Sequence, residues 1–364
     1  MKLGSLVSAG VSVLLLGALV APVTIVPVAS ASAATSAATS AGARRDAYYR
    51  RAALARKVRP ITTTPVAVAA IPVPVAVPAK PDRWIGTFVS GSAENLTNLS
   101  TLETKVGQKF TVRNYFQNTS QGFTAVQATA ISDHGAIPMA TLEFQNPAVG
   151  TGMSGGSYKQ IAAGSMDAYL IKYATNSKNF GRPVWVRPFH EMNGNWYPWA
   201  GTATGNTPAD FIAAWRHVHA IFKNAGATNV KFVWSPNADS VPNTSANGIA
   251  KYWPGSTYVD YIGLDGYNFG TTTSTWRSFT SVFGAAYSSV IALDATKPIF
   301  IAETGCGTVG GNKAAWISDM FNVVPTKFSR LVGITWFNAD KERDWRIESS
   351  TASLNAFKAG SLTF

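Results

Sequence analysis

Eight short apolar runs alternate with longer helical or loop segments from Trp84 to the end of the chain. Runs of four to eight apolar residues separated in this way predict parallel strands joined by crossover helices. The predicted strands are Trp84–Val89, Phe110–Tyr115, Ile137–Phe144, Val184–Phe189, Val230–Trp234, Tyr258–Leu264, Ile299–Ala302 and Leu331–Phe337.

One crossover helix has a complete signature. Thr207 stands at the N-cap position, Pro208 follows at the first helical position, and Gly226 stops the apolar helical pattern. Eight strands with this spacing in roughly 280 residues fit a single (β/α)8 TIM barrel better than an open doubly wound sheet. No glycine-rich phosphate loop follows any predicted strand, which argues against a nucleotide-binding Rossmann fold.

The segment before the predicted barrel has a different character. Met1-Lys2 precedes an uncharged stretch that contains an apolar block and two Ala-x-Ala patterns, the layout of a secretory signal peptide. An uncleaved membrane anchor is the alternative, but Pro22 and Pro27 interrupt the run. We therefore predict a signal peptide over 1–33, a low-complexity basic and Pro-rich linker over 34–82, expected to be disordered or extended, and a catalytic domain over 83–364.

The net charge of +12 is concentrated near the N-terminus. Residues 1–83 have a net charge of +8, whereas residues 84–364 have a net charge of +4. A basic run of this kind is more often a solvated tail than a nucleic-acid site, so we expect no nucleic-acid partner. We expect a secreted monomer without stable membrane insertion after cleavage, and cell-wall association through the basic linker stays open as a further hypothesis.

Two predicted strands end in a glutamate. Catalytic residues of a (β/α)8 barrel lie at the C-terminal ends of strands, where the fourth strand leads to Glu191 and the seventh to Glu303. A strand period of two puts Arg187, Phe189 and Glu191 on one face, and likewise Ile299, Ile301 and Glu303. This alternation predicts that both glutamates point into the barrel mouth.

Paired carboxylates in a cleft rich in aromatic residues favour glycosidic bond cleavage. One carboxylic acid protonates the leaving oxygen and the other carboxylate faces the anomeric carbon. A separation of about 5–5.5 Å gives retention of configuration, and about 6.5–9.5 Å leaves room for water and gives inversion. The sixth strand brings Asp265 and Tyr267 to the same region.

These motifs resemble glycoside hydrolase family 26 of the clan A barrels, whose best-known members are endo-β-1,4-mannanases. The resemblance lies in the run Arg-Pro-Phe-His-Glu-Met-Asn-Gly-Asn-Trp that ends at Trp196, in Ala-Glu-Thr-Gly around Glu303, and in Trp-Phe-Asn from Trp336. It implies retention, with Glu191 as the acid/base and Glu303 as the nucleophile.

The resemblance also implies supporting roles around the two glutamates. His190 would orient the acid or contact the sugar, and Tyr267 would hydrogen-bond the nucleophile and keep it ionised. Trp196 and Trp336 would be sugar platforms. Arg187 would hold the carboxylates in their charged form, and Asp265 would support the site.

One departure from the mannanase pattern concerns the sugar. Mannanases of this family tend to have a histidine near the end of the third strand, where this chain offers Glu143. Glu143 is a third inward carboxylate, which is expected to bind sugar hydroxyls and would favour a glucan. The leading prediction is a retaining endo-β-glycanase acting on plant-type β-1,4-mannan, with β-1,3-1,4-glucan or xylan as alternatives. A non-catalytic carbohydrate-binding barrel is the alternative from a different class.

No metal or cofactor is expected. His190-Glu191 is not the start of a zinc protease motif, because Gly194 stands where the second histidine is required. His217 and His219 are two residues apart on a helix and so point to different faces. Cys306 is the single cysteine, which excludes an intramolecular disulfide, and we interpret it as a small buried residue.

Overall fold

The computed structural model describes residues 83–203, 205–272 and 274–364, and in these ranges eight parallel strands close into a barrel. Each strand pairs with its neighbours in chain order, and β1 pairs with β8 to complete the ring. The predicted (β/α)8 barrel is therefore confirmed. The predicted signal peptide and linker lie outside the described residues.

The strands lie close to their predicted positions. Two match the prediction at both ends, and the others differ at one or both ends, most at β6 and β7. They are β1 (Trp84–Val89), β2 (Val112–Asn118), β3 (Ile137–Glu143), β4 (Val184–Pro188), β5 (Val230–Trp234), β6 (Tyr261–Asn268), β7 (Ile299–Cys306) and β8 (Leu331–Asn338).

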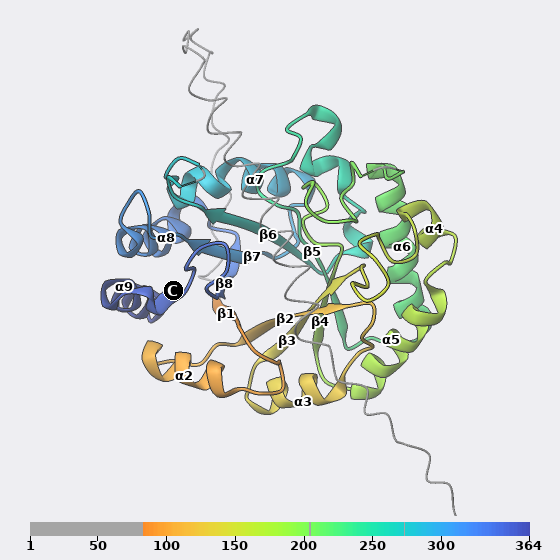
Figure 1. The fold of residues 1–364 in the computed structure, drawn as a ribbon, viewed down its shortest axis with the longest axis horizontal. Coiled ribbons are helices and arrows are strands. Elements are labelled where there is room, and N and C mark those ends of the chain that lie inside the picture. Colours follow the sequence, from red (N-terminus) through yellow and green to blue (C-terminus); the bar gives the residue numbers. More distant parts are fainter. Residues whose placement is uncertain (1–82, 204, 273) are drawn as a thin grey trace, which may run out of the picture.

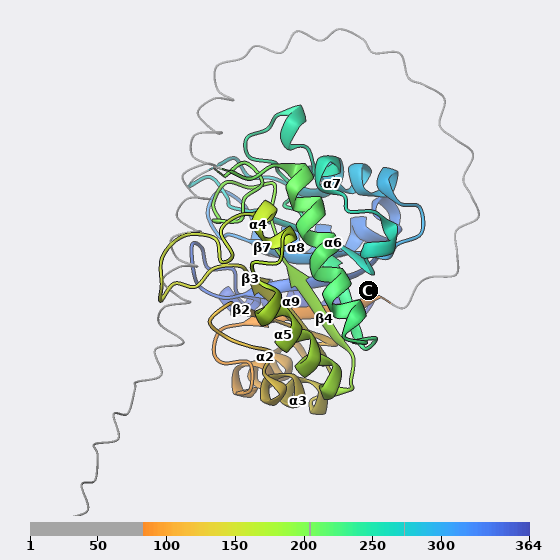
Figure 2. The same cartoon turned by 90° about the vertical axis from the view of Figure 1, so that its right-hand side faces the viewer.

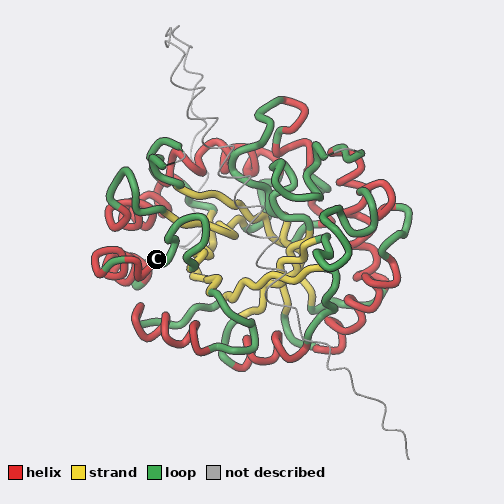
Figure 3. Tube along the Cα trace, in the orientation of Figure 1, coloured by secondary structure: helices red, strands yellow, loops and turns green. Residues whose placement is uncertain are grey.

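Helices surround the strands on the outside, as the side view also shows (Figures 1 and 2). In Figure 3 the strands form an inner ring and the helices an outer one. The α-helices are α2 (Thr97–Val106), α3 (Ala125–Asp133), α4 (Tyr158–Ala162), α5 (Asp167–Phe180), α6 (Pro208–Asn224), α7 (Phe279–Leu293), α8 (Lys313–Lys327) and α9 (Thr351–Ser361). Short 3-10 turns are η1 (Ser245–Asn247), η2 (Ile249–Tyr252), η3 (Ser256–Tyr258) and η4 (Ile347–Ser349).

Helix α6 forms as its sequence signature predicts. The Thr207 hydroxyl accepts a hydrogen bond from the backbone N–H of Asp210, and Pro208 opens the first turn. Gly226 follows the last turn with φ of 72°, a left-handed conformation that glycine adopts without strain. The buried face of α6, which includes Phe211 and Trp215, packs into the core between helices and strands.

The lower part of the barrel interior is apolar. One buried cluster takes side chains from the strands alone and contains no helical residue, which identifies it as the packed interior. Its members, with those packed against it, are Trp84, Val112, Ile137, Met139, Trp185, Val233, Tyr261, Phe300, Ala302 and Val332.

A polar layer lies above this apolar floor. Arg187 donates through Nε to the Thr141 hydroxyl at 2.9 Å, and Thr141 in turn donates to Oδ1 of Asn114 at 2.7 Å. On its other side Arg187 donates to Asp265 at 2.9 Å, and Ser235 also donates to Asp265 at 2.9 Å. Hydrogen bonds therefore connect β2, β3, β4 and β6 with the residue after β5, straight across the barrel interior.

None of the helices in the described ranges has the length and apolar character needed to cross a membrane.

The tight floor of the barrel gives a stability prediction. A Cβ added at Gly333 would lie 2.2 Å from the ring of Trp84, which packs beside Trp185 and Phe300. Because the ring is held on several sides, Gly333→Ala is expected to lower the free energy of unfolding by about 1–3 kcal/mol.

Gly284→Ala is the matched control. It lies in α7, where the nearest atom to an added Cβ is 3.9 Å away. Since alanine is the better helix former, this change should stabilise the protein by about 0.5–1 kcal/mol. Denaturant unfolding measures both variants, and equal stability of Gly333→Ala and wild type would contradict the packing argument.

Candidate active site

Glu191 reaches the barrel mouth through an irregular backbone. Strand β4 ends at Pro188, and both Phe189 and Glu191 have positive φ, 52° and 53°. The prediction that Phe189 shares the inner face was wrong. Its ring stacks on Phe144 at 3.8 Å and contacts Tyr158 of α4, on the outside of the barrel. Two left-handed residues in three positions break the alternation, and such strain is typical of functional sites.

Glu303 also follows an irregularity. In β7 the inward residues are Phe300 and Ala302, whereas Ile299 and Ile301 pack outward, opposite to the predicted faces. A bulge then shifts the register, so that Asp265 pairs with Glu303 immediately after Leu264 pairs with Ile301. The extra residue reverses the alternation and turns Glu303 inward, a known effect of β-bulges beside active sites.

Glu303 is held by a cation and a phenol. Its Oε1 accepts a short hydrogen bond from the Arg187 guanidinium, and its Oε2 accepts one from the Tyr267 hydroxyl at 2.7 Å. Both donors lie on strands, and the Glu303 side chain is nearly buried. The carboxylate is therefore fixed in one orientation with its negative charge compensated.

Arg187 is fully buried and bonded to two carboxylates, Asp265 and Glu303. Burial opposes its charge, but the nearby carboxylates outweigh that effect and raise the pKa of Arg187 above its ordinary value. The guanidinium therefore remains charged, and its several N–H groups bind both acids at once.

Glu191 accepts hydrogen bonds from neutral donors. The Trp196 indole N–H donates to Oε2 at 2.6 Å, and the Asn237 amide donates to Oε1 at 2.7 Å. Asn237 is itself held by two reciprocal hydrogen bonds of 2.8 Å with Asn193. The sequence analysis did not single out Asn237, although its position just after β5 places a polar side chain at the same end of the barrel.

His190 and Trp196 lie beside Glu191, and both are almost fully buried. The His190 ring packs near Tyr197 at 4.7 Å and near Phe116 at 5.8 Å. Trp196 lies against Gly194, where an added Cβ would come within 2.5 Å of its ring. Tyr197, which the sequence analysis did not name, is partly exposed and stacks on Trp199 at 4.3 Å.

Trp336 does not join these residues. It is fully buried on the outer side of β8, next to Trp316 of α8 and Phe357 of α9, and its indole donates to the Trp345 carbonyl at 2.8 Å. The inward aromatic residue of β8 is Phe337 instead. A sugar platform at Trp336 is therefore incompatible with its position behind the strand.

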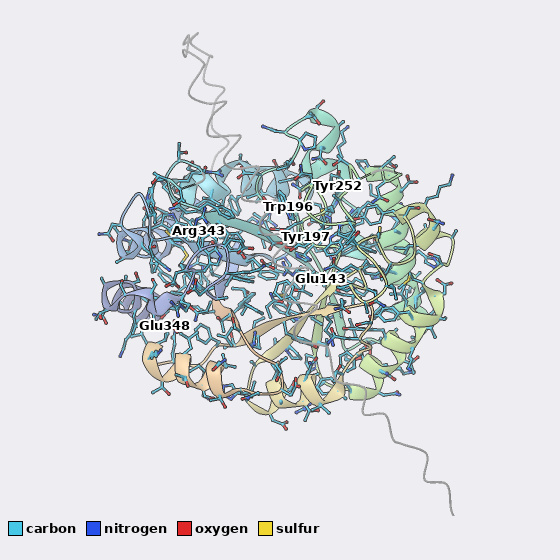
Figure 4. All side chains as sticks on the ribbon, in the orientation of Figure 1. Glu143, Trp196, Tyr197, Tyr252, Arg343 and Glu348 are labelled. Carbon is cyan, nitrogen blue, oxygen red and sulfur yellow. The ribbon has the colours of Figure 1, made fainter. Side chains whose placement is uncertain are left out.

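Glu143 lies at the end of β3, and Figure 4 labels it near the centre of the barrel. It is buried and accepts a hydrogen bond from the Gln145 amide at 3.1 Å. Burial raises the pKa of Glu143 to about 7, opposed in part by that hydrogen bond and by the charges of Lys341 and Arg187. The negative charge of Glu303 adds to the upward shift. Below pH 7 this carboxyl group can therefore donate as well as accept hydrogen bonds.

Cys306 is buried in the outer core and not in the barrel mouth. Burial raises the pKa of its thiol to about 12, although a hydrogen bond from Asn268 acts in the opposite direction. A thiol with that pKa is a poor nucleophile at neutral pH. In the part of the chain that the structure describes, no three His, Cys, Asp or Glu side chains gather as metal ligands.

The raised pKa of Glu143 predicts a pH-dependent stability. The folded state binds this proton more tightly than the unfolded state, so the contribution is complete below about pH 4.5 and is lost as pH rises to about 7. Glu143→Gln removes the titration. Between about pH 4.5 and pH 7, the free energy of unfolding of the variant should therefore rise relative to that of wild type, by up to about 3 kcal/mol. Above about pH 7 the difference between the two should stay constant.

Denaturant unfolding from pH 4 to 8 measures this difference. Glu94→Gln, a change at an exposed carboxylate, is the control and should show no comparable trend. A difference between Glu143→Gln and wild type that is constant with pH would contradict the shift.

Comparison with known sequences agrees with this geometry. The family model "Glycosyl hydrolase family 26" matches residues 102–306, more than half of the chain. Endoglucanase H of Acetivibrio thermocellus is 39% identical over 284 residues, which is 76% of this chain and 29% of that protein. A mannan endo-1,4-beta-mannosidase of Bacillus subtilis is 31% identical over 225 residues, 56% of each chain. The chain thus spans less than two thirds of the length of either relative.

Solved structures share the fold. The catalytic domain of a GH26 endo-beta-1,4-mannanase from Bacillus sp. JAMB-750 superimposes with a TM-score of 0.57 at 18% identity, covering 77% of this chain and 85% of that one. A Bacillus subtilis mannanase gives 0.55 at 20% identity, covering 76% and 85%. The barrel and the matched family model together show that this chain belongs to glycosyl hydrolase family 26.

Proposed function

We propose that this protein is a secreted, retaining endo-β-glycanase that hydrolyses β-1,4-mannan. The observation that carries the proposal is the pair of buried glutamates at one end of the barrel, each fixed by its own hydrogen-bond donors. Family membership supports the same reaction class. Secretion rests on the N-terminal sequence, and a monomeric state is part of the same proposal.

The donors of the two glutamates suit different roles. Glu303 receives a guanidinium and a phenol, which stabilise a negative charge, as a nucleophile requires. Glu191 receives an indole and an amide, two neutral donors that orient the carboxyl group. A proton donor must carry its proton before the bond breaks, and the two neutral donors of Glu191 suit that role better than the guanidinium that bonds Glu303.

Hydrolysis then follows a double displacement. Glu191 protonates the glycosidic oxygen while Glu303 attacks the anomeric carbon, giving a covalent glycosyl enzyme and a free aglycone. Glu191, now ionised, removes a proton from water, which attacks the same carbon and releases Glu303. Arg187 and Tyr267 hold Glu303 through both steps, and the hydrogen bond from Asn237 keeps the Glu191 carboxyl group in its orientation. No cofactor is needed.

The sugar has a second candidate, β-1,3-1,4-glucan. Mannan is supported by the mannanase relatives and by the mannanases among the similar structures. Glucan is supported by the higher identity to Endoglucanase H, 39% against 31% for the mannanase. It is also supported by Glu143, which stands at the end of β3 where mannanases of this family tend to have a histidine.

Substrate assays decide between them. Mature protein is incubated with mannan, mixed-linkage glucan, xylan and cellulose, and new reducing ends are measured. Release of oligosaccharides of several lengths from mannan is expected. Preferential cleavage of mixed-linkage glucan would instead identify β-1,3-1,4-glucan as the substrate. Tight binding without cleavage of any polymer would favour a non-catalytic binding barrel and overturn the proposal.

Variants at the two glutamates test their roles. Glu303→Ala should abolish turnover, and azide should restore a product of inverted configuration because it occupies the space of the lost carboxylate. Glu191→Ala should slow polysaccharide cleavage by about 10²–10⁴-fold, with less effect on aryl glycosides whose leaving group needs no proton. Glu94→Ala, at an exposed carboxylate, should be fully active. Normal turnover by Glu303→Ala would remove this residue from the mechanism.

A further inference from the structure

Three phenylalanines form an aromatic surface at the barrel mouth, here called the phenylalanine wall: Phe88 of β1, Phe116 of β2 and Phe337 of β8. Phe88 and Phe337 are stacked with ring centroids 4.5 Å apart, and Phe116 meets Phe88 edge-on at 5.3 Å. Phe116 also lies 6.2 Å from Phe337. The three rings therefore make one continuous patch on adjacent strands.

The wall is open toward the mouth. Each of its residues lies near the C-terminal end of its strand and on the inner face, the same face as the apolar floor below. Phe88 and Phe116 are nevertheless only partly buried, whereas Met139 in the floor is fully buried. Exposed aromatic area costs free energy unless something covers it.

The wall lies beside Tyr267 and Arg187, which hold Glu303, and beside His190, the neighbour of Glu191 in the chain. The Phe337 ring lies 6.0 Å from that of Tyr267, whose hydroxyl bonds Glu303. Phe116 lies 5.8 Å from His190, the residue before Glu191. The Arg187 guanidinium is 5.9 Å from the Phe116 ring, within cation–π range. A molecule lying on the wall is thus adjacent to the reacting carboxylates.

Charged side chains lie along one side of the phenylalanine wall. Lys341 places Nζ 5.7 Å from the centre of the Phe337 ring. Glu143 pairs with Asn118 in the β2–β3 register, two residues beyond Phe116 toward the mouth. Electrostatic interactions connect Glu143 with Lys341 and with Glu303. An apolar surface with hydrogen-bonding groups along one side complements a pyranose ring, which has apolar faces and a hydroxyl-bearing edge.

We propose that the phenylalanine wall binds one face of the sugar unit whose anomeric carbon Glu303 attacks. Glu143 and Lys341 then form hydrogen bonds with the hydroxyl groups of that sugar unit. The ligand class is a β-linked pyranoside chain, and the inference rests on the proposed function. The wall takes the role that the sequence analysis assigned to Trp336, which lies behind the same strand. Glu143 and Lys341 become candidate specificity-determining residues, because hydrogen-bonding groups beside the wall can distinguish the two orientations of the C2 hydroxyl by which mannose and glucose differ.

Oligosaccharide binding tests the wall separately from turnover. Titration calorimetry is done in a Glu191→Gln background, which prevents cleavage and leaves Glu303 beside the wall unchanged, with manno- and gluco-oligosaccharides as the probes. Phe88→Leu and Phe116→Leu keep apolar bulk but lose the flat ring. Each should weaken binding of the preferred oligosaccharide about tenfold, the loss expected for one aromatic contact.

Two matched variants exclude a general packing effect. Phe88→Tyr keeps the ring and should keep affinity within about twofold, whereas a loss as large as that of Phe88→Leu would point to packing and overturn the proposal. Trp336→Phe alters β8, the strand of Phe337, on its outer side and should leave affinity unchanged.

The outcomes separate the wall from the reaction. If both leucine variants melt normally and bind as tightly as the background, the wall is not a sugar surface, even when the wild type cleaves polysaccharide. If the wild type cleaves nothing but the leucine variants lose affinity, the proposed hydrolysis fails and the wall stands as a binding site.

Discussion

The buried guanidinium of Arg187 organises the mouth of this barrel. Moving a charge out of water costs several kcal/mol, so a guanidinium with no exposed surface needs hydrogen-bond acceptors on several sides. Arg187 meets this condition by bonding Asp265, Glu303 and Thr141, while Ser235 completes the ring of hydroxyl and acid groups. Removing any one acid would leave the remaining charges poorly compensated inside the barrel.

The polar layer around Arg187 separates two regions with different functions. Below it, large apolar side chains such as Trp185 and Phe300 fill the interior and provide stability. Above it, carboxylates and aromatic rings face the mouth. Because Arg187 is bonded both to Thr141 and to Glu303, the position of Glu303 is fixed by the same hydrogen bonds that cross the barrel interior. Stability and the candidate chemistry therefore share one set of hydrogen bonds.

The sequence predicted the barrel well, because parallel strands buried on both sides leave long apolar runs. It also predicted that Glu191 and Glu303 face inward, but for the wrong reason. Simple alternation assigns Phe189, Ile299 and Ile301 to the inner face, and all three pack outward. A left-handed turn and a bulge correct the direction of each glutamate, and neither feature can be read from residue type alone.

The same limit explains Trp336. Adjacent aromatic residues occupy positions 336 and 337, so hydrophobicity cannot tell which one faces inward, and the register irregularity between β7 and β8 decides it. The irregular backbone ahead of each glutamate follows the usual pattern in which active sites break local rules that the rest of the fold obeys. Asn237 was missed because a single amide after a strand has no distinctive sequence signal.

In the proposed mechanism Glu303, held by Arg187 and Tyr267, is the group that attacks the sugar. Covalent trapping tests it most directly: the protein is incubated with an activated 2-deoxy-2-fluoro-β-glycoside, digested, and mapped by mass spectrometry. One added glycosyl group per chain, attached to Glu303, is expected. A label on Glu191 or Glu143, or hydrolysis of the natural polymer with inversion of configuration, would contradict it.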